Sequence, residues 1–337
     1  MHMSDALLSP VVGGTMWAAS AGAVAYCSAK VRAGLDERRV PLMGVLGAFI
    51  FAAQMINFSI PATGSSGHLG GGLLLAILLG PHAAFLTTAS VLVVQALFFA
   101  DGGLLALGCN IFNLGFFPAF IAYPLIYRRM VGEEPSPPRI AAAAVVSAVA
   151  GLQMGAFGVV LETVCSGISS LPFATFAAIM QPIHLAIGIV EGVATAAVVS
   201  FAFKARPEIV RGAPEARPAG NRPLRRVLLA FLVAALFTGG VVSRFASKDP
   251  DGLEWSIARI TGKDDLKGPG RGVHTALAAL QEKAALFPGY AFAKPAAPKK
   301  DGGDSTGTSV AGIVGGAMTL AVAFLSALLL KKRNWAA

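Results

Sequence analysis

The first two residues, Met1 and His2, combine groups that can chelate one metal ion. A free α-amine, the peptide nitrogen of residue 2 and the imidazole Nδ1 of His2 can close two chelate rings in one plane. Three coplanar nitrogens suit metals that accept tetragonal geometry, chiefly Cu(II) and Ni(II), whereas zinc usually prefers a tetrahedral site. Alone the signal is weak, because a histidine at position 2 also occurs by chance and chain termini are often frayed.

A second histidine, His68, lies in a loop that is rich in glycine and serine. Glycines allow a backbone to bend closely around an ion, and a nitrogen from His68 would complete a square-planar site of four nitrogens. The alternative is a capping or interfacial histidine. The neighbouring Ser65 and Ser66, and Asp5 near the terminus, are candidates for supporting residues. The serines could hold the imidazole ring or stabilise the loop.

The N-terminus must be unprocessed if its amine is to bind a metal. Residues 1–10 have no basic region before an apolar run, so we expect no cleavable signal peptide. Methionine removal normally requires a small second residue, and His2 is large. We therefore expect the mature protein to begin at Met1.

Motifs for enzymatic chemistry are missing from the sequence. The glycine-rich loop lacks the Lys-Ser/Thr of a phosphate-binding loop, and residues 63–67 miss the spacing of a nucleophile elbow by one residue. There is no HExxH, and the three cysteines form no CxxC pair. We therefore expect no enzyme, and neither hydrolase nor ATPase activity in this chain.

Polar residues within apolar stretches have a helical spacing. Gln181, His184 and Glu191 fall on one face of a predicted helix, and Asn110 and Asn113 are three residues apart. Such groups are costly in lipid and usually face the bundle interior. They could line a metal path, but we favour hydrogen bonding between helices.

Composition indicates a membrane protein. The chain has 337 residues, of which 55% are hydrophobic and 13% charged, whereas soluble domains contain about 25% charged residues. Apolar runs of about 20 residues cross the hydrocarbon core as helices. We predict an all-α, polytopic membrane protein with about nine transmembrane helices, at residues 11–31, 41–58, 69–81, 83–100, 103–127, 139–164, 173–203, 225–243 and 308–331.

The basic residues predict the orientation. With the N-terminus outside and the C-terminus in the cytoplasm, 17 of the 27 basic residues lie in inside segments. The short outside loops 59–68, 101–102 and 165–172 contain none. This asymmetry follows the positive-inside rule and accounts for the net charge of +9 without nucleic acid. It also places His68 on the same side as Met1.

A polar, proline-containing segment at 204–224 is predicted to be a cytoplasmic linker. It divides a seven-helix unit, residues 1–203, from a two-helix unit, residues 225–337. The second unit contains a long external segment at 244–307, whose last part, 293–307, is predicted to be flexible.

Several motifs together resemble one family. Residues 1–10, the loop from Pro61 to Pro81, Asn110-Ile-Phe-Asn113 and 184–192 are similar to the substrate-capture components of energy-coupling factor (ECF) nickel and cobalt transporters, the NikM/CbiM family. Residues 250–255, Pro-Asp-Gly-Leu-Glu-Trp, resemble the marker of the NikN-type accessory subunit. The chain thus resembles a fusion of a capture and an accessory component.

The resemblance implies a function and partners. It implies that Met1, His2 and His68 bind Ni(II) or Co(II) as the transported substrate, with no organic cofactor, in a bacterial inner membrane. The implied partners are a transmembrane coupling subunit (T component) and cytoplasmic ATPase subunits (A components). We expect affinity to fall steeply below about pH 6, because the ligands must lose protons.

Three alternatives to nickel uptake stay open from the sequence. They are cobalt uptake for cobalamin synthesis, a metal sensor without transport, and a family relative that captures an organic vitamin. Two features favour nickel over cobalt as the substrate. Deprotonation of an amide nitrogen suits Ni(II) better than Co(II), and the Pro-Asp-Gly-Leu-Glu motif also favours nickel.

Overall fold

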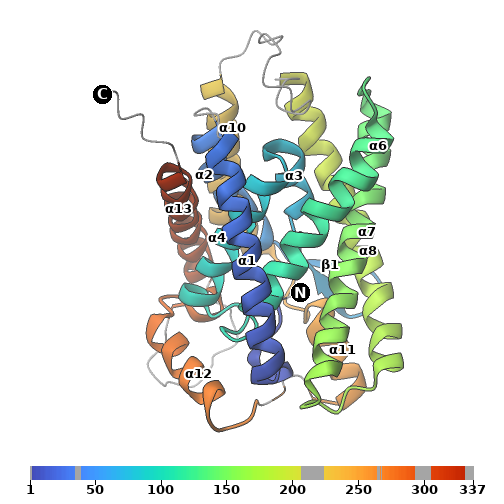
Figure 1. Cartoon of the computed structure of the whole chain (residues 1–337), viewed down its shortest axis with the longest axis vertical. Coiled ribbons are helices and arrows are strands. Elements are labelled where there is room, and N and C mark those ends of the chain that lie inside the picture. Colours follow the sequence, from blue (N-terminus) through green and yellow to red (C-terminus); the bar gives the residue numbers. More distant parts are fainter. Residues whose placement is uncertain are drawn as a thin grey trace.

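A bundle of helices forms most of the molecule (Figure 1). The computed structural model describes residues 2–34, 39–205, 224–263, 266, 268–292 and 305–330. Within these ranges the strands are β1 (Phe58–Ile60) and β2 (Ser65–Gly67), which pair as an antiparallel hairpin with Ser59 opposite Ser66. The hairpin occupies the loop that contains His68, so the loop that sequence analysis identified is an ordered part of the bundle.

The long helices account for the apolar stretches. They are α1 (Pro10–Gly34), α2 (Arg39–Gln54), α4 (Pro81–Phe99), α7 (Pro137–Ser166), α8 (Phe173–Ala205), α10 (Leu224–Gly240) and α13 (Ser305–Leu330). A composite helix consists of α5 (Leu107–Ile111), a π-helical segment (Phe112–Tyr127) and α6 (Arg128–Val131). The shorter helices are α3 (Gly72–Leu79), α11 (Gly252–Thr261), α12 (Val273–Ala284) and the 3₁₀ turns Asp5–Leu7, Val242–Phe245 and Pro288–Tyr290.

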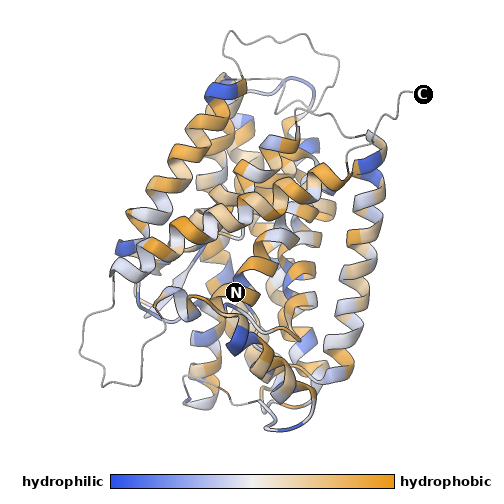
Figure 2. Ribbon diagram, turned by 90° about the vertical axis from the view of Figure 1, so that its left-hand side faces the viewer, coloured by the Kyte–Doolittle hydropathy of each residue, from blue (hydrophilic) through white to orange (hydrophobic). Residues whose placement is uncertain are grey.

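Six of these helices are long and apolar enough to cross a membrane, and Val40–Gln54 is a shorter apolar helix. The prediction of a helical, multi-pass membrane protein is confirmed. The helices are hydrophobic along most of their length, with hydrophilic residues near their ends (Figure 2). The total number of spans and the orientation with the N-terminus outside stay predictions.

The third predicted span, residues 69–81, is wrong as a membrane crossing. Helix α3 has 8 residues, which at 1.5 Å per residue give about 12 Å, less than half of the hydrocarbon thickness. Gly71 (φ 77°) and Gly80 (φ 81°) bound the helix in backbone conformations that favour glycine. All residues of α3 are buried, so it is a core element that follows the His68 loop.

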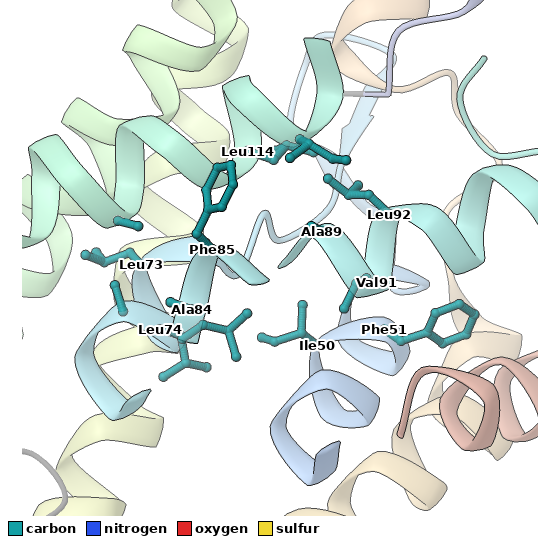
Figure 3. Close-up of a cluster of buried hydrophobic side chains, with 14 of the residues drawn as sticks. Ile50, Phe51, Leu73, Leu74, Ala84, Phe85, Ala89, Val91, Leu92 and Leu114 are labelled. Atoms are coloured by element: carbon teal, nitrogen blue, oxygen red, sulfur yellow. The ribbon is translucent and has the colours of Figure 1, made fainter. Parts of the chain in front are cut away.

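The core lies where α2, α3, α4 and the π-helical segment meet (Figure 3). Phe51 and Phe85 are fully buried there, together with Leu73 and Leu92. Because α3 is surrounded by longer helices, its position is fixed by packing rather than by its own stability. This packing holds the end of the His68 loop in place.

The two C-terminal helices pack against the rest of the bundle. A Cβ at Gly44 of α2 would lie 3.1 Å from the carbonyl oxygen of Leu320 in α13. Gly239 of α10 and Gly312 of α13 are similarly close, as small residues at membrane helix contacts allow. Helices α11 and α12 lie at the end of the bundle where α1 begins (Figure 1). The segment between α10 and α13 therefore reaches the same end as the N-terminal residues.

Candidate metal site

The two histidines singled out from the sequence lie together in the structure. The rings of His2 and His68 are stacked, with centroids 5.1 Å apart and planes inclined by 16°. Both are buried: the His2 side chain is 5% exposed and His68 is 9% exposed. Met1, the remaining member of the predicted site, lies outside the described residues.

Asn110 holds the backbone next to His2. The amide N–H of Met3 donates to Asn110 Oδ1 at 2.8 Å, and Asn110 Nδ2 donates to the Met3 carbonyl at 3.3 Å. Gly103 N–H also donates to the Met3 carbonyl, at 2.9 Å. Asp5 Oδ1 accepts from the N–H of Ala106 at 3.0 Å. Both Asn110 and Asp5 therefore pin the N-terminal segment to the start of the composite helix.

Glu191 of α8 holds the loop after His68. Its two carboxylate oxygens accept from the N–H groups of Gly70 and Gly71, at 2.8 and 3.0 Å. Nδ1 of His68 is 3.1 Å from the carbonyl oxygen of Leu69. If Nδ1 donates there, the lone pair of the neutral ring is on Nε2, as in many histidines that bind metals.

The His2 ring faces an acidic residue. Its Nδ1 is 3.3 Å from Oδ1 of Asp101, and Asp101 Oδ2 accepts from the hydroxyl of Tyr290 at 2.5 Å. In this geometry Nδ1 faces Asp101, whereas the predicted chelate requires Nδ1 on the metal. Chelation by His2 thus requires its ring to turn away from Asp101.

Burial keeps both rings neutral. It lowers the pKa of His2 and of His68 below the ordinary value of about 6.5, against the opposing effect of the Asp101 carboxylate. Each ring is therefore neutral at pH 7 and takes up a proton only at more acidic pH. Neutral imidazole is the form that binds metal ions.

A cavity of about 370 Å³ adjoins the two histidines. Its walls come from both ends of the chain: His2, Gln54, His68 and Asp101 from the N-terminal unit, and Arg244, Asp251, Glu254 and Tyr290 from the C-terminal unit, among others. Sequence analysis identified the two histidines but missed the contribution of the described residues between α10 and α13.

The serines of the loop bind the external segment. Ser66 Oγ donates to the carbonyl oxygen of Asp249 at 2.8 Å, and Ser65 Oγ is 3.4 Å from the carbonyl oxygen of Pro250. These contacts agree with the loop-stabilising role considered for the two serines.

Two other histidines have structural contacts. Nδ1 of His184 is 2.8 Å from the carbonyl oxygen of Met180, within its own helix. Nε2 of His274, in α12, is 2.8 Å from the carbonyl oxygen of Leu8. His274 and Leu8 are 266 residues apart along the chain, so their contact could not be expected from a single sequence.

In the part of the chain that the structure describes, no group of three or more His, Cys, Asp and Glu side chains could hold a metal ion. The predicted donor set needs only two imidazoles, since its other nitrogens belong to the main chain. Imidazole is a good ligand for transition metals, so this buried pair of neutral imidazoles inside a multi-pass helical bundle is a candidate transition-metal site.

Comparisons with known proteins give the family. The family model described as "Cobalt uptake substrate-specific transmembrane region" (CbiM) matches residues 2–209, and the PDGLE domain matches residues 225–332. The chain is 38% identical over 210 residues to a putative metal transport protein of Haloquadratum walsbyi, covering 62% of this chain and 93% of the relative.

Two further matches agree with this family. A putative fused nickel transport protein NikMN of Archaeoglobus fulgidus is 34% identical over 237 residues, covering 70% of this chain and 76% of the relative. The crystal structure of a truncated transition metal transporter is similar with a TM-score of 0.53 and 32% identity, over 60% of this chain and 97% of that one. The chain belongs to the CbiM family and carries a C-terminal PDGLE domain.

Proposed function

We propose that this chain is the substrate-binding membrane component of an ECF-type transporter that takes up Ni(II). In this proposal the metal is bound by four nitrogens: the α-amine of Met1, the amide nitrogen and Nδ1 of His2, and a ring nitrogen of His68. Residues 1–203 capture the metal, 204–224 link the two units, and 225–337 form the accessory unit.

The stacked pair of His2 and His68 is the observation that carries this proposal. The two buried rings have centroids 5.1 Å apart, and burial lowers the pKa of both. Groups with shifted pKa values cluster at functional sites, which supports a common ligand for the pair. Asn110 and Glu191 fix the two backbone segments that present them. The two backbone segments are thus held in place before the metal arrives, which reduces the entropic cost of binding, and the His2 ring has only to turn away from Asp101.

Nickel is favoured over cobalt by the chemistry of the donors. A deprotonated amide nitrogen in a planar set suits Ni(II) better than Co(II). The family description and three of the relatives name cobalt, and three other relatives are named fused nickel transport proteins. Cobalt(II) uptake is therefore the second candidate function.

Energy for uptake comes from partners in this proposal. The sequence contains no nucleotide-binding loop, so ATP would be hydrolysed by cytoplasmic A components and coupled through a transmembrane T component. Uptake of nickel by cells that express the chain with and without these partners separates a transporter from a metal sensor. A sensor would accumulate no additional metal when the partners are present.

Equilibrium binding of Ni(II) and Co(II) to the purified full chain with an untagged N-terminus tests the site. We expect tight nickel binding, and a loss of at least about 100-fold in affinity for His68→Ala or for a chain with an N-terminal extension. His82→Ala is the matched control, because this histidine contacts Tyr26 and Phe120 at the opposite end of α4 from Asp101. Unchanged nickel binding by His68→Ala would refute the site.

A further inference from the structure

The PDGLE motif of the C-terminal unit lies directly against the loop that presents His68. The N–H of Ser66 donates to the carbonyl oxygen of Pro250 at 2.8 Å, and Ser66 and Asp251 form a parallel bridge. The indole N–H of Trp255 donates to the carbonyl oxygen of Thr63 at 3.0 Å. The motif thus adds to the edge of the β1–β2 hairpin, in a register that places Asp251 beside Ser66, two residues before His68.

Asp251 has one role that is local. It is the N-cap of α11: its Oδ1 accepts from the N–H groups of Leu253 and Glu254, at 2.8 and 2.9 Å. Glu254 completes a capping box by accepting from the N–H of Asp251.

Asp251 lies close to the two histidines, which its role as a helix cap does not require. Asp251 lines the same cavity as His2 and His68. His2 contributes a buried Nε2 that has no hydrogen-bond partner among the described residues. The next residue, Gly252, packs so closely on α8 that a Cβ there would lie 2.7 Å from Ile183 and 3.1 Å from His184. A glycine is thus needed to bring the start of α11 this close to the site.

Charge balance gives Asp251 a second role. A dication bound by a deprotonated amide, an amine and two neutral imidazoles retains a net charge of +1, and an uncompensated charge is costly in a buried site. The carboxylates of Asp101 and Glu254 also line this cavity, but the positive side chains of Arg244 and Lys248 line it as well and balance them, so that Asp251 remains to compensate the metal. The N-terminus of α11, which carries about half a positive charge, would add to this cost. A carboxylate at that N-cap reverses the sign of the charge that α11 presents to the cavity.

We propose that Asp251 belongs to the metal site, and that its carboxylate compensates the charge of the bound metal from the side of the accessory unit. This inference rests on the proposed function, because it assumes a metal at His2 and His68. The accessory unit then completes the site itself, in addition to any contact it makes with other subunits.

Asp251→Asn in the full chain with a native N-terminus, titrated with NiCl₂, tests this proposal. Asparagine caps helices about as well as aspartate, so α11 keeps its cap while the charge is lost. We expect nickel affinity to fall about 10–100-fold, with little change in thermal stability. Asp251→Ser, a second uncharged cap, should give the same loss.

Asp249→Asn is the matched control. This carboxylate is exposed and two residues away, and it accepts from Ser59 and Ser247 hydroxyls, as an asparagine oxygen also can. We expect the nickel affinity of the Asp249→Asn variant to stay within about threefold of wild type. Wild-type affinity in Asp251→Asn, or an equal loss in Asp249→Asn, would overturn the role of Asp251. A wild-type chain that does not bind nickel would instead overturn the proposed function.

Discussion

The two halves of the site are built differently. The His2 half is a chain segment tied by main-chain hydrogen bonds to Asn110 and Gly103 of its own unit. The His68 half is a glycine-rich hairpin, held by Glu191 on one side and by the PDGLE motif on the other. In the proposed site the His2 half supplies three of four nitrogens, two of which must lose protons. The His68 half supplies one neutral nitrogen, and the position of the His68 ring depends on residues that are distant in the sequence.

This difference suggests a division of labour. The His2 half determines the chemistry of binding, since its donors set the preferred metal and the coupling to pH. The His68 half determines the geometry, because its single ring must reach the fourth position of a plane that the other half defines. Changes of pH should therefore act on the first half, and changes to supporting side chains on the second.

The largest expected effect is that of pH. Both rings are neutral at pH 7 because burial lowers their pKa values, so only the α-amine, with an ordinary pKa of about 7.7–8.0, and the amide must release protons. We expect about two protons to be released for each nickel bound near pH 7. Affinity should then fall about 100-fold from pH 7.5 to pH 6.5, and more steeply once the rings take up protons at more acidic pH.

Calorimetric nickel titrations in buffers of different ionisation enthalpy measure the number of protons released on binding. His68→Ala, studied at nickel concentrations that saturate it, should release the same number, because its missing ring carried no acidic proton to displace. An affinity that is constant from pH 7.5 to pH 5.5 would contradict the chelate and the assignment of the proton chemistry to the His2 half.

The next largest effect is expected for Glu191→Gln. A carboxylate accepts from both Gly70 and Gly71, whereas the NH₂ group of glutamine would face one of these N–H donors. Hydrogen bonds to charged groups contribute about 1.5–3 kcal/mol each, so the loop should shift and nickel affinity should fall about 10–100-fold.

Glu162→Gln is the control for Glu191→Gln. Glu162 is also buried and accepts from Asn113 Nδ2 at 2.7 Å, but it does not contact the His68 loop. Both variants should lower thermal stability, and only Glu191→Gln should weaken nickel binding. Equal nickel affinities in the two variants would mean that the His68 half does not depend on this carboxylate.

The features predicted correctly from the sequence are those with a local signal. Long apolar runs predicted the membrane helices, since composition alone decides whether a helix tolerates lipid. The 69–81 stretch failed because Gly71 and Gly80 adopt backbone conformations that end a helix, and an average over apolar residues ignores them. Asp251 and Glu254 form a capping-box pattern that could have predicted the start of α11 inside the external segment.

The sequence predicted the proximity of His2 and His68, but not the contacts between the two units. His2 and His68 could be paired from the sequence because a charge pattern placed them on one side and a family resemblance connected them. Tyr290 and Asp101 are 189 residues apart, and a single sequence contains no signal for such a contact. The role of the accessory unit at the cavity therefore emerged only from the fold.

The smallest effect is expected for Tyr290→Phe, which tests whether the accessory unit also influences the His2 half. Burial raises the pKa of Tyr290 well above its ordinary value, so its hydroxyl remains a donor to Asp101 across the physiological range. Phenylalanine removes this donor but keeps the stacking with Phe99, whose ring centroid is 5.2 Å away. Because Asp101 contacts His2 but binds no metal in the proposed site, nickel affinity should change by less than about 10-fold.

The direction of the change in nickel affinity tests whether Asp101 holds His2 Nδ1 away from the metal. Without the tyrosine donor, Asp101 is a stronger acceptor for His2 Nδ1, which must leave it to chelate the metal. Tyr290→Phe should therefore weaken nickel binding slightly, and the further change Asp101→Asn should restore it, because an amide competes less for the ring. Tyr290→Leu, which also removes the aromatic contact, controls for packing. A loss in Tyr290→Phe larger than in Glu191→Gln would mean that the His2 half depends on the accessory unit as strongly as the His68 half does.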